Sequence, residues 1–228
     1  MVLALLVLAG IMVLTALFPR LDLALAGLFY DGAGKGFAMR SRATLILLRE
    51  LGYYLPILVL VLATLVLLPR MRKPRPGPSQ TWRRILFLAL SFALGPGLLV
   101  NGVLKEMSHR PRPSQILEFG GTSEFRPWYV ADGACEHNCS FASGEVAGAT
   151  WLLAPASLLP APWRVVGLAS AGVVTVAVAA LRMGFGGHFA SDAAAAILVT
   201  LAMILAVGWA LLRRDSDAAR FDASAARS

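Results

Sequence analysis

Charged residues and cysteines are scarce in this 228-residue sequence. Only 15% of the residues are charged, whereas 57% are hydrophobic, which is more apolar residue than a water-soluble domain of this length needs. We therefore expect an all-α integral membrane protein. The formal net charge of +8 would suit a nucleic-acid binder, but the basic residues stand in short segments beside apolar runs. That distribution is typical of membrane topology and argues against a nucleic-acid partner.

Six apolar runs are long enough, or nearly so, to cross a hydrocarbon core of about 30 Å. The first run follows no basic residue and is long for a signal-peptide core, so an uncleaved anchor is favoured over a cleaved leader. The sequence predicts one six-span domain over residues 1–214 and a polar tail, 215–228, that we expect to be disordered. The expected spans are residues 2–18, 51–69, 85–104, 143–163, 165–181 and 193–212.

Basic residues between the spans predict the topology. Residues 70–84 hold six lysines and arginines and no acid, so the positive-inside rule places this loop in the cytoplasm. Both termini are then expected in the cytoplasm, and the polar ends of spans three to six meet at the periplasmic face of a bacterial inner membrane. Residues 20–36, rich in glycine and aspartate, predict a loop. Residues 37–50 mix arginines with leucines, which suggests a helix lying in the membrane interface.

A group of polar residues at 182–192 lies between two apolar runs, where charges are costly unless they are paired or functional. His188 and Asp192 are four residues apart, so on a helix the carboxylate can bond one ring nitrogen and aim the other outward as a nucleophile or base. Nearby glycines would let the backbone approach a ligand. Taken alone, the stretch fits a polar turn between two membrane helices equally well.

Two further segments carry groups suited to an anion. Lys105 and Arg112 are seven residues apart beside prolines, and they offer a point charge and a planar fork for phosphate. Ser143 and Gly144 open a predicted helix, whose first N–H groups can bind an anion. A basic membrane-flanking segment and an ordinary serine N-cap are simpler explanations of each segment by itself.

Together the three segments resemble the active-site motifs of the type-2 phosphatidic acid phosphatase superfamily, whose membrane members have six spans. The family pattern is Lys-x6-Arg-Pro, then Pro-Ser-Gly-His, then Ser-Arg-x5-His-x3-Asp. This sequence departs from it at Ala142, Glu145 and Leu181, which replace a proline, a histidine and a serine. The matching residues are Lys105, Arg112, Pro113, Ser143, Gly144, Arg182, His188 and Asp192.

The resemblance implies a phosphatase that works without a metal or another cofactor. His188 would attack phosphorus to form a phosphohistidine, and Asp192 would orient its imidazole. Phosphoryl transfer depends mostly on charge stabilisation and in-line positioning, which side chains can supply without a metal. The groups expected to hold the phosphoryl oxygens are Lys105, Arg112, Ser143, Gly144 and Arg182.

Glu145 stands where the resembled family has the histidine that protonates the leaving oxygen and then activates water. We expect Glu145 to take up a proton when the substrate phosphate binds. The carboxylate and the phosphate are both negative, and their repulsion at close range favours protonation of one of them. Glu145 would then donate that proton to the leaving group. The alternative is that Glu145 only orients Lys105 or Arg112, and that help for the leaving group comes from His109, His137 or nowhere.

Cys135 and Cys139 are the two cysteines of the chain. With the residues between them they offer three plausible metal ligands, Cys135, His137 and Cys139, too few for a convincing site. A disulfide in an oxidising outer compartment is favoured, although the three intervening residues make its geometry demanding.

Several functions are compatible with this sequence. The leading hypothesis is hydrolysis of a lipid phosphate monoester at the periplasmic face, with lipid A favoured over phosphatidylglycerophosphate and phosphatidate because Arg126, Trp128 and Tyr129 suit a bulky sugar headgroup. Alternatives are an isoprenyl (undecaprenyl) diphosphate phosphatase and a lipid-to-lipid phosphotransferase. A non-catalytic binder or transporter of anionic lipid is disfavoured, since binding needs no oriented imidazole. Membrane lipids are the expected partners, and no protein partner is expected.

Overall fold

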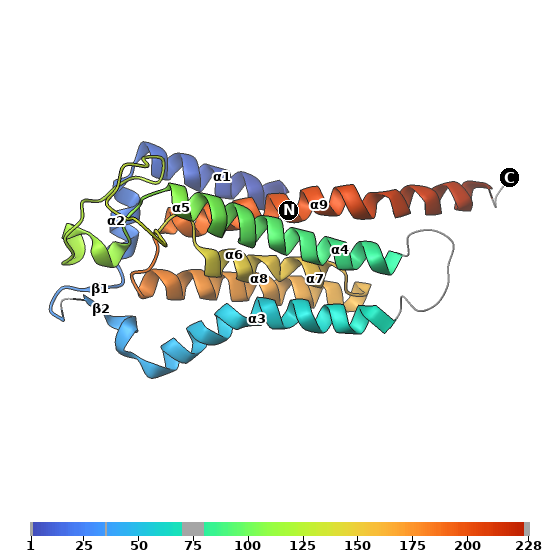
Figure 1. The fold of residues 1–228 in the computed structure, drawn as a ribbon, viewed down its shortest axis with the longest axis horizontal. Helices are drawn as coiled ribbons and strands as arrows, with labels where there is room; N and C mark the ends of the chain where they lie inside the picture. The colour runs from blue at the N-terminus through green and yellow to red at the C-terminus, as the bar shows by residue number, and fades with distance from the viewer. Residues whose placement is uncertain (1, 35, 70–79, 226–228) are drawn as a thin grey trace.

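The structure is a computed structural model that describes the chain except residues 1, 35, 70–79 and 226–228, with the backbone alone described at 2 and 213–225. Long helices run side by side along the long axis (Figure 1). They are α1 (Val2–Leu17), α3 (Ala43–Leu67), α4 (Gln80–Phe92), α8 (Ala161–Gly184) and α9 (Ala190–Ala225). Most of the basic loop predicted over 70–84 lies outside the described residues.

Four helices within the described part of the chain are long and apolar enough to cross a membrane, namely Ala43–Leu67, Gln80–Met107, Ala161–Gly184 and Ala190–Leu212. A fifth candidate is the bent pair of α1 and α2 (Arg20–Gly27), whose helices meet at 105°. The chain is thus a multi-pass helical membrane protein with four or five candidate spans, and the predicted count of six is not confirmed.

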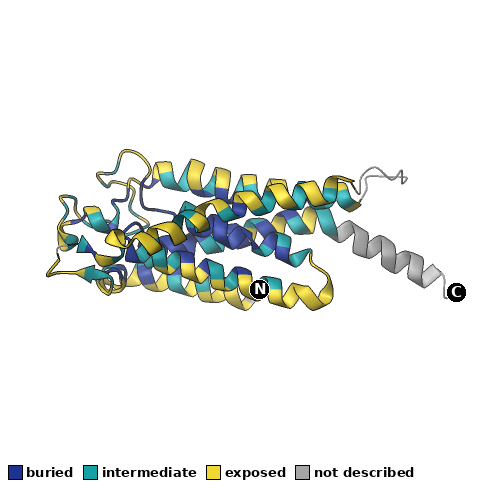
Figure 2. Cartoon of the chain, turned by 90° about the horizontal axis from the view of Figure 1, so that it is seen from below, coloured by how far each residue is buried: buried dark blue, intermediate teal, exposed yellow. Residues whose placement is uncertain are grey.

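The predicted fourth span, 143–163, is two short helices, α6 (Gly144–Trp151) and α7 (Leu153–Ser157). Pro155 has no N–H to donate to the carbonyl four residues earlier, so the helix is interrupted near Leu152. Every residue of α6 from Val146 to Trp151 is buried. Figure 2 shows this buried layer at the centre of the bundle, with exposed residues on the outer helices.

Two other expectations about the N-terminal part were wrong. Residues 20–27, expected to be a loop, form α2, which begins after Pro19 and buries Asp22 and Ala26. Residues 43–50, expected to lie in a separate interfacial helix, are the first turns of α3, which continues unbroken through Pro56 to Leu67. Helix α9 has the bounds Ala190–Ala225, and the expected disorder of the polar tail stays a prediction.

One end of the bundle, which we call the loop end, collects the irregular segments (Figure 1). It holds α2, the hairpin of β1 (Tyr30–Asp31) with β2 (Gly36–Phe37), and the long connection between α5 (Lys105–Met107) and α6. A π-helical stretch, Ala93–Leu104, joins α4 to α5. Because α6 and α9 both begin at this end and α8 finishes there, the three motif segments converge on it.

Candidate active site

A cavity of about 460 Å³ opens where the motif segments meet. Its lining combines apolar side chains of α3 and α4 with charged and polar groups. Ser143 and Asp192 are fully buried beside it. The expected site residues that line the cavity are Lys105, Arg112, Gly144, Glu145, Arg182 and His188.

His188 lies in the short connection before α9 and is only 2% exposed. Its Nδ1 is 2.6 Å from the carbonyl oxygen of Ser140. A carbonyl can only accept, so Nδ1 carries the hydrogen and Nε2 keeps a lone pair. Burial, together with the positive charge of the nearby Arg182, lowers the pKa of His188 to about 4. The imidazole is therefore neutral at neutral pH, with Nε2 unprotonated.

The expected hydrogen bond between His188 and Asp192 is not formed. Asp192 Oδ2 is 3.7 Å from His188 Nδ1, which is too long for a hydrogen bond. The carboxylate is instead occupied by the Ser140 hydroxyl at 2.5 Å, the Phe189 N–H at 2.8 Å and the guanidinium of Arg110. Asp192 thus stabilises the first turn of α9, while the Ser140 carbonyl sets the tautomer of His188.

Four cationic side chains line the cavity with His188, and three of them were expected from the sequence. Lys105 Nζ lies 3.3 Å from Asn101 Oδ1, and Arg112 Nη2 donates to the Asn138 carbonyl at 2.8 Å. Burial lowers the pKa of Arg112, yet an arginine remains charged. Arg182 ends α8, and its Nε is buried without a partner among the described residues. These groups can neutralise the oxygens of a bound phosphoryl group.

The start of α6 supplies neutral donors to the same space. Gly144 is the first residue of α6, so its N–H has no partner within the helix. The Ser143 hydroxyl is buried and makes no hydrogen bond to the described part of the chain. A side chain at Gly144 would collide with Asn101, so the glycine lets α6 approach the π-helical stretch. The role of Ser143 and Gly144 in binding an anion stays a prediction.

Glu145 is held by two arginines. Its Oε1 lies 3.3 Å from Arg182 Nη1 and 3.0 Å from Arg49 Nη2. These partners differ from Lys105 and Arg112, the two cations that the sequence suggested. The second oxygen, Oε2, is buried and has no hydrogen-bond partner within the described residues. One oxygen of this carboxylate is therefore committed to the arginines, and the other is left for a ligand.

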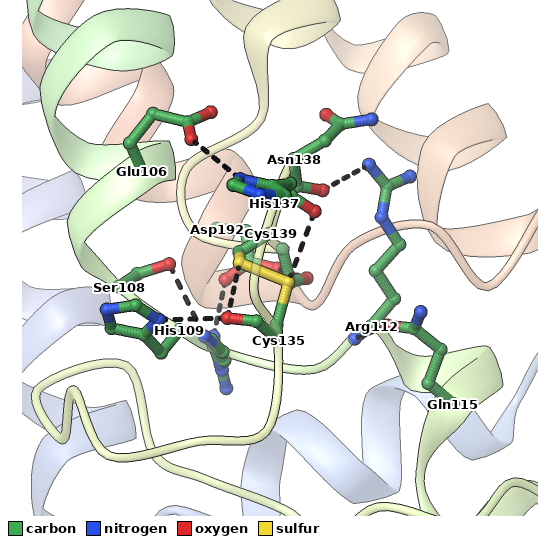
Figure 3. The surroundings of a disulfide bond; sticks show 12 residues. Glu106, Ser108, His109, Arg112, Gln115, Cys135, His137, Asn138, Cys139 and Asp192 are labelled. Atoms are coloured by element: carbon green, nitrogen blue, oxygen red, sulfur yellow. Dashed lines mark hydrogen bonds and ion pairs between the residues drawn. A yellow bond between two sulfur atoms is a disulfide. The ribbon is translucent and has the colours of Figure 1, made fainter.

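The cysteine loop borders the cavity. Cys135 and Cys139 form a disulfide bond (Figure 3). The loop that this bond closes contains Asn138, whose carbonyl accepts the hydrogen bond from Arg112. His109 and His137, considered as alternative acids, do not line the cavity. No three histidine, cysteine, aspartate or glutamate side chains of the described chain are grouped as metal ligands would be.

Several residues at the site were missed by sequence reasoning. Arg49 was assigned to an interfacial helix, and Arg110 is an unassigned position within Lys-x6-Arg. Ser140 acts through its backbone carbonyl, which no side-chain pattern can indicate. The glycines were expected to admit a ligand, yet a side chain at Gly184 or Gly186 would collide with Met39 or Phe37, so these two glycines make room for the segment that follows β1. For Arg49 and Arg110 the sequence offered one signal, because a charged residue in an apolar chain is costly unless it is paired or functional.

An oriented imidazole and four cationic side chains at one cavity of an apolar helical bundle are features expected of a membrane enzyme that hydrolyses phosphoric monoesters. The PAP2 superfamily model matches residues 84–215, more than half of the chain. The chain belongs to the PAP2 superfamily, the family that the three motifs indicated.

The curated relatives carry a single name. A lipid A 4'-phosphatase of Francisella tularensis subsp. novicida is 33% identical over 77% of this chain and 79% of its own length. Lipid A 4'-phosphatases of Rhizobium leguminosarum and Rhizobium etli are 33% and 32% identical over 83% of this chain, covering 87% and 79% of their lengths. No solved structure gives a significant match.

Proposed function

We propose that this protein removes a phosphate from lipid A at the periplasmic face of the bacterial inner membrane, through a phosphohistidine on His188 and without a metal. The observation that carries the proposal is the neutral imidazole whose Nδ1 is bonded to Ser140. Because His188 lines the cavity, its Nε2 is the nitrogen left for phosphorus. The names of the three relatives support lipid A as the substrate.

The first chemical step forms the phosphoenzyme. The lone pair on Nε2 attacks phosphorus, and the bond from phosphorus to the sugar oxygen breaks on the opposite side. Lys105, Arg112 and Arg182 stabilise the charge on the transferring group. Water then attacks the phosphorus of phosphohistidine, the P–N bond breaks, and the imidazole returns to its neutral form as inorganic phosphate leaves.

Glu145 supplies the proton in this scheme. When the substrate dianion binds Arg182, it competes with Glu145 for the same cation and favours protonation of the carboxylate. The oxygen Oε2 is buried and unpartnered within the described chain, which supports its role as the atom that protonates the leaving sugar oxygen. The resulting carboxylate can then accept a proton from the attacking water.

The cavity suits a substrate whose phosphate stays at headgroup level. Tyr53, Ile57 and Phe92 line it on the side of α3 and α4, within helices long enough to cross the membrane. Arg126, Trp128 and Tyr129, which were expected to bind a sugar headgroup, do not line the cavity. Trp128 stacks on Phe141, and Arg126 pairs with Glu124 and Asp132. Support for lipid A therefore comes from the relatives rather than from that loop.

The test is phosphate release by purified protein from lipid A, undecaprenyl diphosphate, phosphatidylglycerophosphate and phosphatidate in detergent micelles. We expect lipid A to have the highest kcat/KM and His188→Gln to be inactive while still folded. A second reaction with a labelled acceptor lipid detects phosphotransfer. A higher kcat/KM for another lipid, or label in the acceptor, would replace lipid A hydrolysis with the corresponding reaction.

We further propose six crossings with both termini in the cytoplasm, in which α6 and α7 together form the fourth crossing inside the bundle. The six lysines and arginines within residues 70–84 support this orientation, because the positive-inside rule places such loops in the cytoplasm. A cysteine introduced at Ser123 should be labelled by a membrane-impermeant thiol reagent in spheroplasts, whereas one at Thr81 should be labelled only after lysis. The reverse pattern would place the site in the cytoplasm.

A further inference from the structure

A buried charge network connects the N-terminal helix pair to the catalytic helix. Asp22 of α2 is 1% exposed, and Arg110, which follows α5, is fully buried. Arg110 Nη2 donates to Asp22 Oδ2 at 2.8 Å, and Arg110 Nη1 pairs with Asp192 on the other side. One guanidinium therefore lies between two buried carboxylates, one of which belongs to the site.

Asp22 also bonds directly to the start of α9. Its Oδ1 accepts the backbone N–H of Ser191 at 2.9 Å, and its Oδ2 accepts the Ser191 hydroxyl at 2.5 Å. Ser191 is the second residue of α9, so this N–H has no partner within the helix. Asp22 thus supplies the cap for a helix that starts almost 170 residues later in the chain.

Arg110 is held rigidly between the two carboxylates. Its Nε donates to the Arg126 carbonyl at 2.8 Å, and its guanidinium lies 4.2 Å from the ring centre of Phe189. Arg110 Nη1 also donates to the Ser191 hydroxyl at 2.8 Å. Because Phe189 is the neighbour of His188, a displacement of Arg110 would move Asp192 and the connection that carries the nucleophile.

Stability alone is a poor explanation of this arrangement. Removing charges from water is costly, and apolar residues of similar volume often stabilise a protein as well as a buried ion pair does. Charged groups with fixed hydrogen-bond directions instead impose one geometry on the residues they bond. Here the residues so fixed are Asp192 and the first turn of α9, directly after His188.

We propose that Asp22 is a positioning residue for phosphate hydrolysis, which acts through Arg110 and Ser191 to hold Asp192, the start of α9 and so His188. Asp22 lies outside residues 84–215, the part that the family model matches. The N-terminal helix pair is then part of the catalytic unit of this chain. This inference rests on the proposed role of His188.

The first experiment compares Asp22→Asn with Asp31→Asn in purified protein. Asp31 is a matched control, since it is exposed and its side chain accepts a hydrogen bond only from the nearby Ala33 N–H among the described contacts. The substrate is lipid A or phosphatidate, whichever the wild type hydrolyses faster. We expect Asp22→Asn to lower kcat by about 10- to 100-fold, the usual cost of losing a residue that orients another, with KM unchanged. Asp31→Asn should match the wild type.

A double-mutant cycle separates positioning from packing. If Asp22 acts through Asp192, Asp22→Asn should cost little more in an Asp192→Asn background, because the two residues belong to one network. An unchanged kcat in Asp22→Asn, a raised KM alone, or equal losses in both backgrounds would overturn the inference.

Two further variants test the inference if Asp22→Asn does not fold and separate it from the proposed function. If Asp22→Asn fails to fold, as judged by size-exclusion chromatography and melting in detergent, Ser191→Ala is measured instead. It removes a hydroxyl without changing charge, and it should lower kcat at constant KM; an unchanged kcat overturns the inference. An active His188→Gln would refute the proposed function as well, whereas an inactive one beside a normal Asp22→Asn refutes this inference alone.

Discussion

Acid should destabilise the folded protein through His188 itself. Burial lowers its pKa from 6.5 to about 4, so between these values the unfolded chain binds a proton that the folded chain does not. The stability contributed by the neutral imidazole is complete above pH 6.5 and is lost as the pH falls toward 4. This difference in pKa corresponds to about 3 kcal/mol of unfolding free energy.

The assay is thermal melting of the protein in detergent from pH 8 to pH 4, for wild type and His188→Gln. For a chain of this length about 3 kcal/mol corresponds to a Tm change of roughly 6–12 °C. Other groups also titrate, so the measured quantity is the difference between the two proteins at each pH. Between pH 8 and pH 4, the Tm of the wild type should fall by roughly 6–12 °C more than the Tm of His188→Gln.

A second histidine provides the control. His109 is exposed at the loop end, so His109→Gln controls for the replacement of a histidine by glutamine outside the core. If His188→Gln and the wild type lose stability in parallel from pH 6.5 to 4, the imidazole is not buried in its neutral form. The assigned tautomer, which leaves Nε2 as the nucleophile, can be checked by ¹⁵N NMR of labelled histidine, where a hydrogen on Nε2 would contradict it.

Three other outcomes are expected. Glu145→Gln keeps the shape but carries no proton, so kcat for a sugar phosphate should fall about 10²- to 10⁴-fold; near wild-type rates across pH would refute the acid role and make Glu145→His the next variant to test. Activity should persist in EDTA and be inhibited by vanadate, and a loss that a divalent metal restores would contradict the metal-free mechanism. Cys135→Ser opens the loop whose Asn138 carbonyl holds Arg112, so KM should rise while the protein stays folded; an unchanged KM would show that Arg112 is held without the disulfide.

Hydropathy alone located most of the membrane helices. A long apolar run is a local property, so four of the expected spans coincide with helices of the required length. Whether a helix continues or breaks depends less on the local hydropathy. The break near Leu152 and the extension of α3 through residues 43–50 depend on a proline and on packing against neighbours, which a hydropathy average does not register.

The residues that form the site could be predicted from the sequence, because its motifs keep fixed spacings within short segments. Lys105, Arg112, Arg182 and His188 form one set by residue type and spacing alone, and the fold brings them to one cavity. Their roles as nucleophile and phosphate ligands follow from residue chemistry and stay predictions for the variants described above.

Only the tertiary structure decided which groups orient these residues. The carbonyl that sets the tautomer of His188 is 48 residues away, the Arg49 that pairs with Glu145 is 96 away, and Asp22 is 88 residues from Arg110. None of these contacts follows from a helical or strand period, since each joins segments that meet only after the helices pack. A carbonyl, moreover, is present at every residue, so no sequence pattern can mark the one at Ser140 that bonds the imidazole.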